Sequence, residues 1–322
     1  MKTFVIGDVH GRRAQLNQII EMIPRDPERD MLILLGDLID RGDDVPGTVA
    51  DIVRLHEQHP TRVLSLRGNH EQMLLDFVDE GATLWLHAAV GSECTFQQYT
   101  GKPLRVRSEQ DFATLRAEFT AAIPPAHLEF FRSLPLFYED DYALYVHAGL
   151  REGAHPRDTP AQHLLWSRDG NFFRNYTGKP CVFGHTPAPL LPLRGRLGRH
   201  GIYISHSAIG IDSGYINSSP LSCLQLPECM LYQAFADGHT ATHHLTSFMP
   251  EPLRAMQRKV AAHQPATVPA RQPRGEVRRG RRRPRTGGAQ APRRGPAPRP
   301  LRGLRRSPAA AVRRAVDAGG GP

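Results

Sequence analysis

The strongest constraint on this chain is that each of its first three hydrophobic runs ends in glycine beside acidic, imidazole or amide side chains. "KTFVIG" leads into "GDVHG" (7–11), "DMLILLG" into "GDLIDRG" (36–42), and "RVLSLRG" into "RGNHE" (67–71). Short apolar runs bounded by glycine are typical of buried strands. Desolvating a carboxylate costs several kcal/mol unless a cation or strong donors compensate. Carboxylates at these strand ends therefore call for a metal ion, an arginine or open water.

The segments between these runs predict helices. In "RRAQLNQIIEMI" the side chains of Leu16, Ile19 and Ile23 recur at helical spacing, and "PGTVADIVRLHEQH" and "HEQMLLDFV" follow the same pattern. Strand–helix alternation predicts an α/β fold with a parallel sheet, whose ligands bind beyond the carboxyl ends of the strands. We therefore expect one edge of this sheet to gather the polar residues of the three motifs: Asp8, His10, Asp37, Asp40, Arg41, Asn69 and His70.

The rest of the chain changes character twice. Residues 82–135 predict helices, read as an insertion over the sheet. Closely spaced strand patterns follow, typical of an antiparallel sheet, and two of them end at "VHAG" with His147 and at "VFGHTP" with His185. After about His263, proline, glycine, alanine and arginine dominate, and such a segment cannot bury enough apolar surface to offset its ordering entropy. We expect a folded domain over residues 1–250 and a disordered tail over residues 251–322.

Charge is divided unevenly between these parts. Residues 271–322 contain 16 arginines against Glu276 and Asp317, a net charge of +14, whereas residues 1–270 carry −5. An arginine run would permit weak, sequence-independent contact with nucleic acid. This arginine run contains no aromatic side chain for stacking on bases. A competing explanation for the run is translation of GC-rich DNA past an ancestral stop codon.

Cysteines and the N-terminus point to an intracellular protein. Cys94, Cys181, Cys223 and Cys229 form no CxxC pair, so we expect reduced thiols rather than a disulfide framework. The apolar run in "MKTFVIGDVHG" is too short for a signal peptide. No window approaches the roughly 18 consecutive apolar residues of a transmembrane helix. These patterns predict a cytoplasmic protein with no membrane contact.

The residue types at the predicted sheet edge suit divalent cations. Asp, His and Asn together favour first-row ions such as Mn²⁺, with Fe and Zn as alternatives. Two ions about 3.5–4 Å apart can share one carboxylate, clamp a phosphate and activate a hydroxide for in-line attack. This chemistry explains both Asp37, as a cation ligand, and Arg41, as a phosphate ligand.

In their order and spacing, "GDVHG", "GDLIDRG" and "GNHE" resemble the signature of PPP-type phosphoprotein phosphatases of bacterial type, within the calcineurin-like metallophosphoesterases. "HAG" and "GHTP" are similar to that family's later histidine motifs, so the resemblance covers about residues 1–245. It implies a β-sandwich flanked by helices (α/β/β/α) and a two-metal phosphomonoester hydrolase.

The resemblance also implies a role for each matching residue. Asp8 and His10 would hold one metal ion, with Asp37 shared between the two ions, and Asn69, His147 and His185 would complete the second site. His70 would protonate the leaving oxygen, supported by Asp40. Arg41 and Arg168, the latter in "LLWSR", would bind phosphate oxygens. Asp212 in "IGIDSG" is expected to support a turn or a ligand rather than bind metal.

Two enzymatic functions stay open. A Ser/Thr, or additionally Tyr, protein phosphatase is the leading interpretation, with a phosphorylated protein or small molecule as substrate. Symmetrical diadenosine tetraphosphatases share "GDVHG" and "GNH", but that group generally replaces the aspartate at the position of Asp40 and has Asp where this chain has Glu71. The non-enzymatic alternative is a nucleic-acid-binding protein acting through the arginine-rich tail.

Overall fold

The computed structural model describes residues 1–106, 108–151, 154–193, 196–197, 200–214 and 218–245, and a few positions between 251 and 262. The chain divides into two units, residues 1–266 and 267–322. The second unit, and with it nearly all of the predicted disordered tail, lies outside the described residues. No helix among the described residues is long and apolar enough to cross a membrane.

The first sheet contains the three strands predicted from the N-terminal motifs. Strands β1 (Thr3–Ile6), β2 (Met31–Leu34) and β3 (Val63–Ser65) pair in parallel. β10 (Leu221–Leu226), β11 (Met230–Ala234) and β12 (Thr240–His244) extend the sheet on the other side of β1 in antiparallel pairs, giving the order β12-β11-β10-β1-β2-β3. The carboxyl ends of β1, β2 and β3 therefore lie at one edge, as predicted.

The second sheet has the order β4-β5-β6-β9-β8-β7. Its members are β4 (Phe137–Glu139), β5 (Leu144–Val146), β6 (Cys181–Phe183), β7 (Arg196–Leu197), β8 (Ile202–Ser205) and β9 (Ala208–Gly210). The expectation of a wholly antiparallel sheet is wrong for its centre, because β5, β6 and β9 pair in parallel. Parallel neighbours need a crossover connection, and the segment between β5 and β6 supplies one that contains two helices.

Side-chain alternation explains why the sheets stack between helices. Along β1, Val5 belongs to the apolar core between the two sheets, whereas Phe4 and Ile6 belong to the core under the helices. Helices α1 (Arg13–Met22), α2 (Val45–Gln58) and α3 (Asn69–Glu80) contribute to the core outside the first sheet, and α7 (Ala161–Trp166) and α8 (Gly170–Asn175) to that of the second. This confirms the predicted α/β/β/α sandwich.

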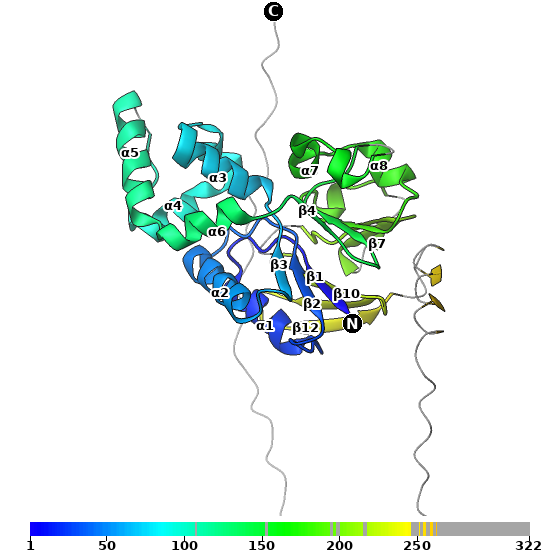
Figure 1. The fold of residues 1–322 in the computed structure, drawn as a ribbon. Coiled ribbons are helices and arrows are strands. Elements are labelled where there is room, and N and C mark those ends of the chain that lie inside the picture. Colours follow the sequence, from blue (N-terminus) through cyan, green and yellow to red (C-terminus); the bar gives the residue numbers. More distant parts are fainter. Residues whose placement is uncertain are drawn as a thin grey trace, which may run out of the picture. The chain divides into compact units, whose positions relative to one another are not determined.

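The helical segment of residues 84–133 belongs to the first helical layer. It comprises the 3₁₀ turns η1 (Leu84–Leu86) and η2 (Ala88–Val90) and helices α4 (Ser92–Thr100), α5 (Glu109–Ala122) and α6 (Pro125–Ser133). Figure 1 shows α4, α5 and α6 gathered with α3, apart from α7 and α8. Trp85 packs against Phe77 of α3 and Phe119 of α5, with ring centroids 5.0 and 4.8 Å apart. Two further 3₁₀ turns are η3 (Pro156–Asp158) and η4 (Ala188–Leu190). The domain limits stated above stay a prediction.

Candidate metal and phosphate site

The predicted site residues lie on loops that leave the strands with an unusual backbone. Of seven described non-glycine residues with positive φ, five belong to the predicted site: His10 (46°), Asp37 (49°), Asp40 (70°), Arg41 (68°) and His185 (63°). Such conformations cost energy for residues with a side chain, and they concentrate at functional sites. The sharp turns direct consecutive side chains of the second motif toward a common point.

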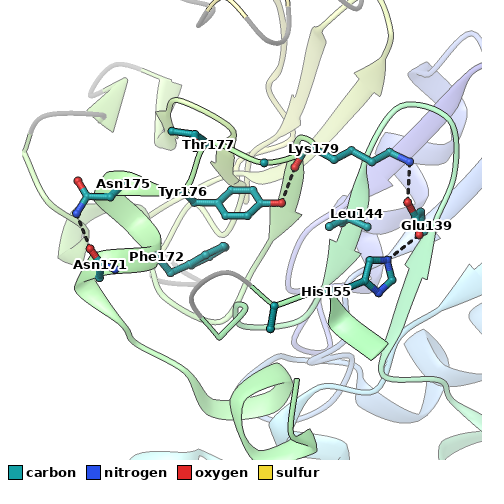
Figure 2. A pocket seen from close by; sticks show the side chains of 11 residues that line it. Glu139, Leu144, His155, Asn171, Phe172, Asn175, Tyr176, Thr177 and Lys179 are labelled. Carbon is teal, nitrogen blue, oxygen red and sulfur yellow. Dashed lines mark hydrogen bonds and ion pairs between the residues drawn. The ribbon is translucent and has the colours of Figure 1, made fainter. Parts of the chain in front are cut away.

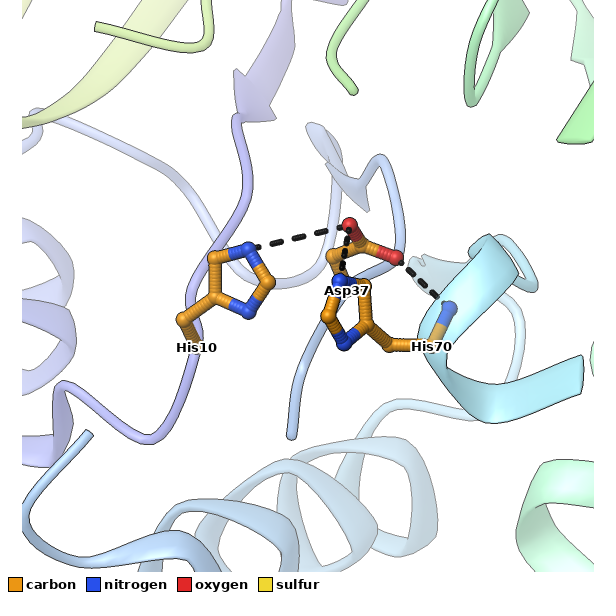
Figure 3. A group of neighbouring side chains, drawn as sticks. All are labelled: His10, Asp37 and His70. Carbon is orange, nitrogen blue, oxygen red and sulfur yellow. Dashed lines mark hydrogen bonds and ion pairs between the residues drawn. The ribbon is translucent and has the colours of Figure 1, made fainter. Parts of the chain in front are cut away.

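A first group of potential ligands surrounds the carboxylate of Asp37. Nε2 of His10 and Nε2 of His70 each lie 3.7 Å from Oδ2 of Asp37. Both rings face this carboxylate, and the backbone N–H of His70 donates to its other oxygen, Oδ1, at 3.1 Å (Figure 3). Residue 68 must be glycine here, because a Cβ at that position would lie 2.2 Å from Oδ1 of Asp37.

The guanidinium of Arg41 lies between the two imidazoles of this group. Nη1 donates to Nε2 of His10 at 2.8 Å, and Nη2 donates to Nε2 of His70 at 3.1 Å. Nδ1 of His10 donates to the carbonyl of Ile39 at 2.8 Å, which leaves a lone pair on its Nε2. Nδ1 of His70 instead pairs with Oδ2 of Asp40 at 2.7 Å. One imidazole therefore presents a ligand atom, and the other is set up to carry a proton.

A second group gathers Asp37 with His147, which follows β5, and His185, which follows β6. Oδ1 of Asn69 lies 3.0 Å from Nε2 of His147 and 2.8 Å from Nδ1 of His185. Nε2 of His147 is also 3.3 Å from Oδ1 of Asp37. Within each group the potential ligand atoms, one from each residue, lie within 4.8 Å of one another.

The chemistry of this second group fits a cation. Nδ1 of His147 donates to the carbonyl of Leu35 at 2.9 Å, so Nε2 presents a lone pair to the oxygens of Asn69 and Asp37. Burial lowers the pKa of His147, which opposes a second proton on that ring. Acceptor atoms that face one another without a proton repel one another unless a cation lies among them.

Asp8 supplies a further sign of a cation. Its Oδ2 accepts a hydrogen bond from the backbone N–H of His185 at 2.9 Å, but its buried Oδ1 has no hydrogen-bond partner among the residues that the structure describes. Buried polar atoms without partners are rare in proteins and call for an explanation. A Cβ at Gly184 would lie 2.0 Å from this oxygen, so the glycine is required for the carboxylate to lie there. Asp8 belongs to neither compact group. The first group combines His10 and Asp37 with His70, whereas the predicted first metal site combines them with Asp8.

Burial and mutual repulsion shift the pKa values of the site. Burial, followed by Asp212 and Asp37, raises the pKa of Asp8. Burial alone would raise the pKa of Asp37, but the surrounding histidines outweigh it and lower that pKa. Burial and the neighbouring His147 lower the pKa of His185 to about 3. These directions favour neutral imidazole ligands around one ionised carboxylate.

His70 differs from the other histidines of the site. Burial by itself lowers the pKa of His70, but Asp37 and the hydrogen bond with Asp40 more than compensate and raise it. Burial, followed by His70, lowers the pKa of His10. The carboxylate on Nδ1 is therefore what distinguishes a proton-carrying ring from a ligand ring.

Two residues that hold Asp40 escaped the sequence analysis. The hydroxyl of Thr95 on α4 donates to Oδ1 of Asp40 at 2.6 Å and accepts from its backbone N–H at 3.0 Å. Nε1 of Trp85, also fully buried, donates to both carboxylate oxygens at 3.3 and 3.2 Å. No local pattern links either residue to Asp40, which lies 55 residues before Thr95 and 45 residues before Trp85.

Glu71 is a third supporting residue that the prediction did not include. Its buried carboxylate accepts the backbone N–H groups of Asp37 at 2.9 Å and Leu38 at 2.7 Å. It also accepts the N–H of Gly68 at 2.8 Å, so it ties the second motif to the third. Its place at the end of "GNHE" was the available signal.

The predicted phosphate ligands lie on one small cavity. A volume of about 290 Å³ is lined by Asp37, Arg41, Asn69, His70, Trp166, Arg168 and His185. Nε of Arg168 donates to Nε2 of His185 at 3.4 Å, so this arginine lies beside the second group as Arg41 lies beside the first. Asp212 is buried and accepts the N–H of Gly214 at 2.9 Å, which agrees with the predicted turn role.

A second cavity, of about 540 Å³, opens on β4, β5 and α8 and contains none of the predicted residues. Figure 2 shows the carboxylate of Glu139 between the side chains of His155 and Lys179, each 2.9 Å away. Its charged groups neutralise one another, so the cavity does not resemble a phosphate site.

Comparison with known proteins agrees with this geometry. Residues 1–208 match the calcineurin-like phosphoesterase family, and this range includes every residue of the predicted site. The chain is 44% identical over 84 residues to serine/threonine-protein phosphatase 1 of Salmonella typhimurium, covering 26% of this chain and 36% of that protein.

Other relatives carry a different name. Symmetrical bis(5'-nucleosyl)-tetraphosphatase of Methylobacillus flagellatus is 31% identical over 150 residues, covering 47% of this chain and 44% of that one. The enzyme of the same name from Chromobacterium violaceum is 25% identical over 303 residues, covering 75% of this chain and 99% of that one. The chain therefore spans less than half the length of the Salmonella and Methylobacillus relatives.

Proposed function

Because the chain belongs to the calcineurin-like phosphoesterase family, we propose that it is a metal-dependent phosphomonoesterase, specifically a serine/threonine protein phosphatase. The substrate is a phosphorylated protein, and small phosphorylated molecules would enter the same cavity.

The observation that carries the proposal is the 2.7 Å pair between Nδ1 of His70 and Asp40, beside Arg41 in the cavity. Releasing serine from a phosphomonoester expels an alkoxide, a poor leaving group that needs a proton in the transition state. Symmetrical cleavage of diadenosine tetraphosphate breaks the central P–O–P bond and expels ADP, a good leaving group whose terminal phosphate oxygen needs little protonation. An imidazole held by a buried carboxylate is thus more useful for a phosphoserine substrate.

Six residues would hold two divalent ions, with Mn²⁺ as the proposed metal because oxygen and imidazole ligands suit it and Fe or Zn as alternatives. They are Asp8, His10, Asp37, Asn69, His147 and His185. Bound ions of this kind supply Lewis-acid polarisation of the phosphoryl group and a lowered pKa for an attacking water.

The arginines and His70 would handle the substrate itself. Arg41 and Arg168 would bind phosphate oxygens through their planar forks. Arg41 donates to Nε2 of His70 in this structure, so that nitrogen accepts rather than donates. A phosphate that draws the guanidinium away frees Nε2 to carry the proton that goes to the leaving oxygen, while Asp40 holds Nδ1.

Symmetrical diadenosine tetraphosphatase activity is the alternative, favoured by the relatives of that name and above all by the one matched over nearly its whole length. It would use the same metal and arginine ligands. The proposed nucleic-acid contact of the arginine-rich tail lies outside the described residues.

The test compares both substrates on one preparation. The full chain is treated with chelator, verified metal-free by elemental analysis, and reloaded with Mn²⁺, Fe²⁺ or Zn²⁺. Release of phosphate from a phosphoserine peptide and of ADP from diadenosine tetraphosphate is then measured side by side, with His206→Asn, a change at an exposed histidine, as the control protein.

We expect no turnover without metal, recovery of turnover with Mn²⁺, and a higher kcat/KM for the phosphopeptide than for diadenosine tetraphosphate. Full turnover in the metal-free sample would contradict the metal assignment. A higher kcat/KM for diadenosine tetraphosphate would favour the alternative.

A further inference from the structure

A large apolar groove lies on the helical segment beside the catalytic cavity. Its volume is about 1120 Å³, and Leu84, Leu86, Val106 and Phe112 are among its lining residues. Leu84 is 55% exposed and Val106 46% exposed, two of only five large hydrophobic side chains so exposed among the described residues. Exposed apolar side chains gathered in one groove mark a place where another molecule binds.

The groove and the catalytic cavity share one wall. Gly91 lines the groove, and its carbonyl accepts the backbone N–H of Arg41 at 3.0 Å. The carbonyl of the preceding Val90 accepts Nε of Arg41 at 3.2 Å. A Cβ at Gly91 would lie 2.6 Å from Cγ of Arg41, so the backbone of the groove packs directly on the side chain that lines the catalytic cavity.

The charge of the groove limits what it binds. Glu93 and Glu109 line it, and the lining residues that the structure describes include no lysine or arginine. The two carboxylates repel a polyphosphate. They attract a basic polypeptide and have little effect on an uncharged one. The groove therefore suits a peptide better than the remainder of a dinucleotide.

We propose that this groove binds the polypeptide next to the phosphorylated residue and takes up an apolar side chain from it. An extended chain advances roughly 3.3–3.6 Å per residue. Because the groove adjoins the wall of the catalytic cavity, the proposal places the apolar side chain one to three residues from the phosphorylated serine. The inference rests on the proposed phosphatase function and adds a specificity site to it.

The experiment uses the metal-loaded full chain and a matched set of phosphoserine peptides. In each peptide a single leucine occupies one of the three positions on either side of the phosphoserine, and all other flanking residues are alanine. At one position or more, leucine is expected to raise kcat/KM about tenfold, since burying such a side chain is worth that much or more.

Two surface substitutions link this preference to the groove. Leu84→Ser and Val106→Ser are each expected to reduce the leucine preference about threefold, because each removes part of the apolar lining. Hydrolysis of a small aryl phosphate, which does not reach the groove, should be unchanged. Leu193→Ser is the matched control, because Leu193 is 79% exposed and is not a lining residue of the groove.

The outcomes separate the groove from the proposed function. Phosphopeptides that are hydrolysed equally well with leucine at every position would overturn the groove alone. Equal losses on peptide and aryl phosphate in Leu84→Ser would overturn it as well. A protein that cleaves only diadenosine tetraphosphate would overturn both proposals, and a loss of that activity alone in Leu84→Ser would assign the groove to a nucleoside.

Discussion

The two groups of potential metal ligands share Asp37 but differ in what surrounds their imidazoles. In the first group, the guanidinium of Arg41 lies between His10 and His70, and Asp40 occupies Nδ1 of His70. In the second, Nε2 of His147 faces the oxygens of Asn69 and Asp37. Proximity to Asp37 is thus common to both groups, and it does not by itself define a ligand.

The partner of Nδ1 on each imidazole accounts for the difference between ligand and acid. His10 and His147 donate Nδ1 to a carbonyl, which fixes a lone pair on Nε2 and prepares a metal ligand. His70 donates Nδ1 to a carboxylate, which favours the protonated ring. We therefore expect His70 to be the acid although it lies as near to Asp37 as His10 does.

The largest effect is expected at the residue that both groups share. Asp37→Asn removes a charge that both ions need, so metal content and turnover should fall together, with kcat at least roughly 10³-fold lower. Elemental analysis and phosphopeptide kinetics measure the two losses. Asp237→Asn, at an exposed aspartate, is the control. Two ions retained in Asp37→Asn would show that the groups do not depend on a shared ligand.

The next prediction compares His147 and His70 directly. His147→Asn should lose metal and reduce hydrolysis of every substrate alike, because it removes a ligand. His70→Asn should keep both ions and lower kcat for a phosphoserine peptide by about 10²–10⁴-fold, with a smaller loss for an activated aryl phosphate. Both variants are assayed on both substrates, with metal content measured in each.

A different result at His70 would remove the distinction between ligand and acid. If His70→Asn loses metal and affects both substrates equally, His70 is a ligand of the first group. The distinction drawn from Nδ1 would then be wrong.

Arg41 and Arg168 extend the comparison to phosphate binding. Arg41 donates to two site histidines, and Arg168 donates to one, His185, at 3.4 Å. Arg41→Ala should lower kcat/KM about 10²-fold and Arg168→Ala about tenfold, as each loses charge-assisted hydrogen bonds to phosphate, with metal content unchanged. Arg29→Ala, on the exposed surface, is the control. Equal losses would place both arginines in equivalent positions on the phosphate.

An effect as small as that of Arg168→Ala is expected at Thr95, which acts on the first group through Asp40. Thr95→Val removes a 2.6 Å hydrogen bond and should lower kcat for the phosphoserine peptide about tenfold, with little change for the aryl phosphate. Thr95→Ser should restore activity. Thr100→Val is the control on the same helix, since its hydroxyl bonds to the carbonyl of Phe96 instead. An equal loss on both substrates, or no rescue by serine, would indicate a merely structural role.

Local sequence patterns were enough to predict the parallel strands β1, β2 and β3 of the first sheet and the residues at their carboxyl ends. Strand and helix periods are local, so "GDVHG", "GDLIDRG" and "GNHE" could be placed at the ends of β1, β2 and β3 without long-range information. The carboxyl ends of parallel neighbours lie at one edge, and this rule brought Asp8, Asp37 and Asn69 together before any coordinates.

The way in which the remaining residues complete the site depends on long-range packing. The second sheet was predicted to be antiparallel, yet its central strands are parallel, because their pairing depends on crossovers that strand patterns do not reveal. Thr95 and Trp85 reach Asp40 across 55 and 45 residues of chain, through the packing of the helical segment on α3. Contacts of this kind arise from the shape of the packed core rather than from spacing along the chain, so the composition of the site could be predicted and its support could not.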